Sequence, residues 1–290
     1  MLLSILGIRS YAGTTDYLTL SVLSFPPQLE RLWFLGVFIG LAVKIPLFPF
    51  HIWLPQAHVE APTAGSVMLA GVLLKVGGYG LLRFCWPLFP VASGYFTPFI
   101  MALSVLSMVY AGLVTCRQTD LKRIIAYSSI SHMGLVTASL FSETITGFFA
   151  GMFLMLSHGL TSSTLFILVG LLYSRHQTRL ITNFRGLAIT MPLFSCLFLL
   201  SLLANCSLPT TSNFIGEFLS LYCVIGYSYS VGVFSLVGGF LSAVYSIFLF
   251  NRVCFGAPGG LICFGRDLTR LEFLVVFPLV VLNFFLGVFP

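Results

Sequence analysis

The chain has 290 residues, of which 58% are hydrophobic and only 8% are charged. A soluble domain carries about 25% charged residues, so this composition cannot cover a water-facing surface and indicates an integral membrane protein. The formal net charge of +6 is then better explained by basic residues gathered on one membrane face than by nucleic-acid binding. The seven cysteines form no CxxC pair, and no Rossmann or P-loop glycine pattern is present, so we expect neither an iron–sulfur site nor a bound nucleotide.

A short apolar segment at 1–8 is followed by eight apolar stretches, each long enough to cross a bilayer. They cover roughly residues 32–54, 63–89, 95–115, 123–141, 144–173, 187–226, 229–251 and 271–289. Prolines interrupt the first stretch, at Pro46 and Pro49, and the sixth, at Pro209 in "ANCSLPTTSNFIGEF". Unwound backbone inside a membrane is tolerated where it lines a polar cavity or is buried in protein. We therefore expect an all-α membrane fold of about eight transmembrane helices, whose two broken helices are typical of a transporter ion path; two ordinary kinks are the alternative.

The basic residues between these stretches predict the orientation of the chain. Alternating spans place on one face Arg117, Lys122, Arg123, Arg175, Arg179, Arg185, Arg252, Arg266 and Arg270. The positive-inside rule assigns this face to the cytoplasm or the mitochondrial matrix.

Two lysines lie within the predicted spans. Lys75, in "AGVLLKVGGYG", lies deep in its span, roughly 18 Å from the near end, which is beyond the reach of a lysine side chain to the membrane surface. We interpret it as a buried functional lysine, because a desolvated amine can exchange protons near neutral pH. Lys44 lies beside the break at Pro46, where either a polar cavity or an extended side chain that reaches the membrane surface would solvate it.

One carboxylate and two histidines complete the set of ionisable residues inside the spans. Glu217 follows the second break, with Asn213 four residues earlier on the same helix face, and should be protonated, paired or hydrated. His132 and His158 each lie in a helix among hydroxyl-bearing residues, which can hold a hydrogen-bonded water chain. A purely structural role is the alternative for either histidine alone.

Two further histidines, His51 and His58, flank "WLPQAH" at the basic face and are weaker candidates for a proton uptake site or a loop anchor. We expect no metal site, because the histidines are spread over distant segments without a carboxylate ligand set. The remaining residues predict a midplane row: Lys44, Lys75, His132, His158 and Glu217. Such a row conducts protons because a charge arriving at one group changes the proton affinity of the next.

Four long motifs carry a resemblance to a known family. They are "VKIPLFPFHIWLPQAHVEAPTAGSVMLAGVLLKVGGYGLLR", "RQTDLKRIIAYSSISHMGLV", "SHGLTSSTLFILVG" and "LPTTSNFIGEF". From about residue 30 onward the chain resembles the subunit 4 family of NADH dehydrogenase, the antiporter-like, proton-pumping membrane subunits of respiratory complex I (NADH:ubiquinone oxidoreductase).

By this resemblance the eight spans are similar to helices 7–14 of the family, and the five residues of the row match its central hydrophilic axis. Residues 1–31 would be a helix stub with a connecting segment, and 32–290 the C-terminal part of the antiporter-like domain, including one complete five-helix repeat. The family also has a glutamate on an earlier helix, thought to pair with the lysine matched by Lys44. We expect a separate polypeptide to supply that carboxylate and the missing N-terminal helices.

The resemblance also implies partners and a location. NADH, FMN, iron–sulfur clusters and ubiquinone would be bound by partner subunits of the membrane and peripheral arms, and this chain would carry no cofactor. The Phe-rich composition suits an organellar gene. We therefore expect a multi-pass protein that lies in the mitochondrial inner membrane rather than in a bacterial plasma membrane. The alternatives are an Mrp-type cation/proton antiporter subunit and a structural remnant that only holds the membrane arm together.

Overall fold

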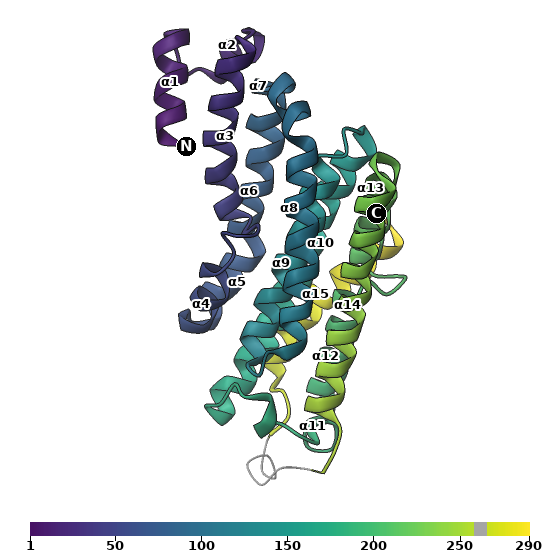
Figure 1. Ribbon diagram of the computed structural model, residues 1–290. Helices are drawn as coiled ribbons and strands as arrows, with labels where there is room; N and C mark the ends of the chain where they lie inside the picture. The colour runs from purple at the N-terminus through teal and green to yellow at the C-terminus, as the bar shows by residue number, and fades with distance from the viewer. Residues whose placement is uncertain (258–265) are drawn as a thin grey trace.

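The computed structural model describes residues 1–257 and 266–290, which form helices joined by turns and short loops (Figure 1). The all-α fold is therefore confirmed for this part of the chain. In chain order the helices are α1 (Leu2–Ala12), α2 (Tyr17–Val22), α3 (Pro27–Lys44), α4 (Trp53–Glu60), α5 (Thr63–Met68), η1 (Leu69–Leu73), α6 (Leu74–Gly80), η2 (Leu81–Cys85), α7 (Trp86–Leu88), α8 (Pro90–Arg117), α9 (Leu121–Leu140), α10 (Ile145–His176), η3 (Ile181–Asn183), α11 (Leu187–Thr190), α12 (Pro192–Asn205), α13 (Ser212–Tyr227), α14 (Tyr229–Cys254) and α15 (Arg270–Val288).

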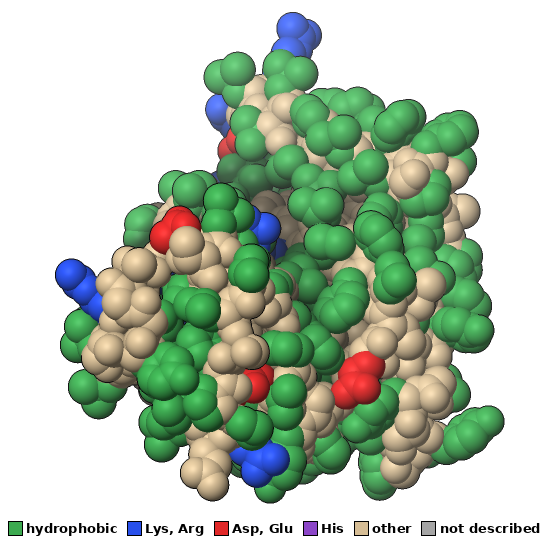
Figure 2. All heavy atoms as spheres, turned by 90° about the horizontal axis from the view of Figure 1, so that it is seen from above, with side chains coloured by type: hydrophobic (Ala, Val, Ile, Leu, Met, Phe, Trp, Pro, Cys, Tyr) green, Lys and Arg blue, Asp and Glu red, His purple; other side chains and the backbone are tan. Residues whose placement is uncertain are grey.

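Five continuous helical segments among the described residues are long and apolar enough to cross a membrane. They are Thr63–Leu88, Pro90–Arg117, Ile145–His176, Tyr229–Cys254 and Arg270–Val288. Large apolar side chains on them are exposed, and Figure 2 shows hydrophobic side chains over most of the molecule's outline, with only scattered charged ones. A surface of this kind is stable against lipid and not against water. The count of eight crossings stays a prediction, because the other expected spans are broken or more polar.

Both predicted breaks are present. The first lies between the end of α3 at Lys44 and the start of α4 at Trp53, where the indole Nε1 donates to the Val43 carbonyl at 2.9 Å. The second lies between α12 and α13, where the side chain of Asn283 on α15 accepts hydrogen bonds from the backbone N–H and the hydroxyl of Ser212. Side chains from neighbouring segments thus satisfy backbone groups that a continuous helix would pair internally.

Helix α9 covers the expected span 123–141 but is not among the five helices that are apolar enough to cross a membrane by composition. All of its residues except Arg123 and Tyr127 are buried. It packs against α8, α10 and α13, and Figure 1 shows it within the bundle. A helix enclosed by protein can carry the hydroxyls and the histidine that a lipid-facing helix would not.

The N-terminal segment differs in its bounds from the expectation. Helix α3 begins at Pro27, before the boundary expected at residue 32, and Glu30 in its first turn accepts a hydrogen bond from the Ala92 backbone N–H at 2.9 Å. Residues 9–31, whose conformation the sequence left open, contain the end of α1, the short α2 and the start of α3.

The loops that carry the basic residues meet at one end of the bundle, as alternating spans predict. The backbone N–H of Leu121 donates to the Arg179 carbonyl at 3.0 Å, and that of Gly186 donates to the Phe255 carbonyl at 3.3 Å. The ammonium of Lys122 donates to the Ala61 carbonyl at 2.8 Å at this same end. These contacts join the segments that follow α4, α8, α10 and α14 (Figure 1).

Close packing of α13 on α10 depends on Gly216. A Cβ at this position would lie 2.9 Å from Cα of Leu154 and 3.1 Å from its backbone nitrogen, and backbone cannot move aside as a side chain can. We expect Gly216→Ala to destabilise the protein by about 1–3 kcal/mol, measured as a lower thermal unfolding midpoint of the purified native assembly. Gly226→Ala on the same helix is the matched control, because no heavy atom lies within 4 Å of its Cβ. Equal midpoints for the two variants would contradict this packing.

Candidate functional site

Lys75 contacts His158 in the interior of the bundle. The ammonium nitrogen of Lys75, on α6, lies 2.9 Å from Nδ1 of His158, on α10. It also donates to the carbonyl of Ala70, which lies within the π-helical turn η1. The sequence predicts one uninterrupted helix over 63–89 and indicates neither this turn nor the second one, η2. π-Helical turns occur frequently at functional sites, and this one supplies the lysine with a backbone acceptor.

Glu217 contacts His132. Nδ1 of His132, on α9, lies 2.8 Å from Oε1 of Glu217, on α13, and both residues are buried, at 4% and 6% exposure. The contact is an ion pair when the imidazole is protonated. The expectation that a carboxylate at this depth needs a partner is therefore met by a histidine from a neighbouring helix.

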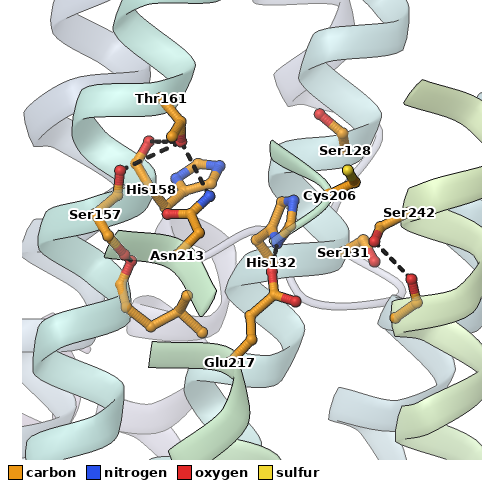
Figure 3. A network of polar contacts seen from close by, with 12 residues as sticks. Ser128, Ser131, His132, Ser157, His158, Thr161, Cys206, Asn213, Glu217 and Ser242 are labelled. Atoms are coloured by element: carbon orange, nitrogen blue, oxygen red, sulfur yellow. Dashed lines mark hydrogen bonds and ion pairs between the residues drawn. The ribbon is translucent and has the colours of Figure 1, made fainter. Parts of the chain in front are cut away.

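These two contacts lie next to each other. The rings of His132 and His158 have centroids 5.3 Å apart at an angle of 45°, and Figure 3 shows them side by side. Four of the five predicted residues thus form a series in the order Lys75, His158, His132, Glu217, in which Lys75 is half-buried and the other three are buried. The spatial order reverses the two histidines relative to the sequence, because α10 lies beside α6 and α9 lies farther along.

Lys44 is not joined to this series. It ends α3, its side chain is exposed, and among the described residues no hydrogen-bond or ion-pair partner contacts its ammonium group. Its helix nevertheless packs on the Lys75 helix, since a Cβ on Gly77 would lie 3.3 Å from Cβ of Lys44.

The two weaker histidine candidates are buried but separate from the series. His58 stacks on Phe166 with ring centroids 4.4 Å apart, and neither of its ring nitrogens has a partner within the described part of the chain. His51 stacks on Phe48 with centroids 5.6 Å apart. Among the described residues no hydrogen bond joins either histidine to Lys75 or His158, so a role in proton uptake stays a prediction.

Asn213 connects the second break to the series. Its side-chain nitrogen donates to the Ala204 carbonyl at 3.0 Å and to the Thr161 hydroxyl at 3.3 Å, one turn along α10 from His158. Since a carbonyl only accepts, the amide orientation is fixed. Asn213 therefore holds the start of α13, and with it Glu217, against the histidine-bearing helix (Figure 3).

Beside the His132–Glu217 contact lies a small cavity of about 10 Å³. Its polar lining consists of Ser131, His132, Glu217 and Ser242. Ser242, which lies on α14, is not among the residues that the sequence predicts for the site, because serines recur along that apolar helix. Within residues 1–257 and 266–290, no group of three or more histidine, cysteine or acidic side chains could hold a metal ion.

The sequence of this chain is similar to those of known proteins. The profile of the family described as "NADH:quinone oxidoreductase/Mrp antiporter, TM" matches residues 1–242. The chain is 53% identical over 290 residues to the NADH-ubiquinone oxidoreductase chain 4 of Metridium senile, covering all of this chain and 59% of that relative.

Solved structures of membrane complexes contain chains with a similar fold. A chain of respiratory complex I from Thermus thermophilus with bound NADH superposes with a TM-score of 0.93 at 33% identity, covering all of this chain and 62% of that one. A chain of the Mrp complex from Dietzia sp. superposes with a TM-score of 0.91 at 19% identity, which shows a shared fold. The chain spans about three-fifths of the length of the curated relatives it matches, 59% for the Metridium protein. With most of its length matched by the family profile, the chain belongs to the NADH:quinone oxidoreductase/Mrp antiporter transmembrane family.

Proposed function

We propose that the chain is part of a membrane-arm subunit of NADH:ubiquinone oxidoreductase and takes part in proton translocation coupled to electron transfer from NADH to ubiquinone. The observation that carries this proposal is the series Lys75–His158–His132–Glu217, held by contacts of 2.9 and 2.8 Å on either side of the two histidines. The 53% identity to a chain 4 of that enzyme favours this function over others of the same fold.

The series can move a proton through groups that the chain itself supplies. The ammonium of Lys75 can pass a proton to Nδ1 of His158, and His132 can pass one from its Nδ1 to the Glu217 carboxylate. Each transfer changes the charge next to the following group and so changes that group's proton affinity. Lys44, at the first break, would load or reset the lysine end of the series.

None of the residues of the series is a redox group. In this proposal NADH, FMN, the iron–sulfur clusters and ubiquinone are bound by partner subunits, and the chain responds to their chemistry through the membrane arm. The partners are other membrane-arm subunits and lipid, and the location is the mitochondrial inner membrane, where the basic end of the bundle would face the matrix.

The helices that pair with Lys44 belong to the same proposal. We expect a carboxylate of a neighbouring helix to pair with Lys44 in the assembled complex, with residues 32–290 supplying one complete five-helix repeat. Lipid beside Lys44 in the assembled complex, where protein is expected, would contradict this arrangement.

A cation/proton antiporter subunit of the Mrp type is the second candidate, favoured by the TM-score of 0.91 to the Dietzia chain. The two functions differ in what drives the proton. Proton movement that requires external Na⁺ and no NADH would establish the antiporter.

The proposed function is tested on native membranes. We would solubilise them gently, separate the complexes on a native gel, stain for NADH dehydrogenase activity and sequence the active band by mass spectrometry. We expect this chain in the active band. Its presence only in a small band without NADH activity would overturn the assignment.

A further inference from the structure

Asn283 is an isolated polar residue on an apolar helix. In the sequence of α15, "RLEFLVVFPLVVLNFFLGV", it is the first polar side chain after Glu272, and it is 2% exposed. A buried amide in such surroundings costs free energy unless it is hydrogen-bonded. Its side-chain oxygen accepts hydrogen bonds from the backbone N–H of Ser212, at 3.3 Å, and from the Ser212 hydroxyl. Asn283 therefore binds the first residue of α13, at the second break.

Gly287, one turn after Asn283, allows the backbone of the break to approach α15 closely. A Cβ at Gly287 would lie 2.5 Å from the carbonyl carbon of Thr211 and 2.6 Å from that of Thr210, so a larger residue would displace this backbone. Thr210 has a φ of 87°, a left-handed conformation that is unfavourable for a β-branched residue. Two residues of α15 thus hold the irregular segment from which α13 starts.

The segment that leads into α15 holds the other end of the broken helix. The carboxylate of Asp267 accepts hydrogen bonds from the backbone N–H groups of Leu193, at 2.8 Å, and Phe194, at 3.2 Å, in the first turn of α12. Glu272, in the first turn of α15, forms an ion pair with Arg175 on α10. Helix α15 packs against α10, α12 and α13 (Figure 1). It therefore connects both halves of the broken helix to one histidine-bearing helix of the series.

We propose that Asn283 is a positioning residue for proton transfer, which places the Glu217 carboxylate beside His132 by fixing the start of α13. Glu217 lies five residues after Ser212 on the same helix, so a displacement of the first turn moves its carboxylate. Asn213 holds this turn against α10, and Asn283 holds it against α15. Proton transfer between Glu217 and His132 depends on the hydrogen-bond distance between them, which is 2.8 Å. This role rests on the proposed function and deepens it.

Three variants separate these hydrogen bonds from the packing of α15. Asn283→Leu keeps the size of the side chain and removes the acceptor of both hydrogen bonds. Asn283→Asp keeps an acceptor oxygen in the same place, whether or not the carboxyl group is ionised. Ser212→Ala removes the hydroxyl and keeps the backbone N–H. Asn251→Leu is the matched control, because it makes the same change at an exposed position of α14. All are made in the complete native complex.

The first measurement is a high-resolution cryo-electron microscopy map of each complex, which does not depend on the proposed function. In Asn283→Leu we expect the first turn of α13 to shift and the distance between Glu217 and His132 to increase by about 0.5 Å, enough to disturb a transfer geometry. Asn283→Asp should keep the native distance. Ser212→Ala, the milder change, should show a smaller shift in the same direction, so the test also stands should Asn283→Leu fail to assemble. A native distance in both Asn283→Leu and Ser212→Ala would overturn the positioning role.

The second measurement is NADH-driven proton translocation in vesicles. We expect about a tenfold loss in Asn283→Leu, the scale of a small misplacement of a reacting group, and no loss in Asn251→Leu. Asn283→Asp should restore translocation to within about twofold of the native rate, which it would not do if the asparagine served only to fill space. Equal losses in Asn283→Leu and Asn283→Asp would overturn the role of the acceptor oxygen.

A double variant tests whether Asn283 acts through Ser212. Because both changes remove the same contact, Asn283→Leu combined with Ser212→Ala should lose no more translocation than Asn283→Leu alone. Additive losses would show that Asn283 acts by another route and would overturn the proposal. If the native complex itself showed no NADH-driven translocation, the proposed function would fail, and the maps would still decide whether Asn283 positions Glu217.

Discussion

Replacing Lys75 with methionine in the native complex is expected to reduce NADH-driven proton translocation by about 100-fold, the scale of losing one proton-transferring group. Methionine has a similar length and keeps the packing between α6 and α10. It removes the donor to the Ala70 carbonyl and the partner of Nδ1 of His158. The measurement is the initial rate of acidification of inverted membrane vesicles on addition of NADH.

Lys75→Arg separates charge from proton exchange. Arginine keeps the positive charge and the donors but does not release a proton at physiological pH. We expect this variant to assemble and still to lose translocation. Reduction of an artificial acceptor by NADH should stay unchanged in both variants, because the redox groups are proposed to lie on other subunits. Translocation at the native rate in Lys75→Met would remove the lysine from the path.

Glu217→Gln is expected to cause a loss of similar size, about 100-fold, at the other end of the series. Glutamine preserves the shape of the side chain beside Nδ1 of His132, yet it can neither ionise nor accept the transferred proton. The measurement is quinone reduction and proton translocation in the same vesicles, where translocation should fall more than quinone reduction.

The control for this substitution is Glu143→Gln. Glu143 lies in the turn between α9 and α10, is exposed and accepts a hydrogen bond from the Thr97 hydroxyl at 3.1 Å. Because Glu143 is outside the series, we expect its loss to change translocation by less than about twofold. Equal losses in the two variants would indicate a general effect of removing carboxylates and not a path through Glu217.

Much of this site could be predicted from the sequence because ionisable residues are rare inside apolar stretches. Lys75, His132, His158 and Glu217 stand out on that ground alone, and the structure brings all four together. The two proline-containing breaks were predictable for a similar reason, since proline cannot continue a helical hydrogen-bond pattern.

The pairing of the four residues could not be predicted. It depends on which helices lie beside one another and on how each helix is rotated about its axis. A single sequence does not specify either. The π-helical turn η1 belongs to this group, because nothing in "LAGVL" distinguishes it from a regular turn. Ser242 was missed because a serine on an apolar helix usually bonds to its own backbone, as this one also does.

Lys44 is the opposite case. The sequence predicts that it belongs to the series, but in the structure it does not contact the other four residues of that prediction through a hydrogen bond or an ion pair. Its side chain is exposed at the first break, while Lys75 is already satisfied by His158 and a backbone carbonyl. Its role therefore depends on groups outside the described contacts and stays a prediction.

The central claim is that the series Lys75–His158–His132–Glu217 carries protons during turnover of the complex. The number of protons translocated per NADH oxidised, measured in vesicles for the native complex and for the Lys75→Met and Glu217→Gln variants during their residual turnover, tests it most directly. The account predicts a lower ratio in both variants than in the native complex. An unchanged ratio at an unchanged rate of NADH oxidation would show that protons do not pass through these residues.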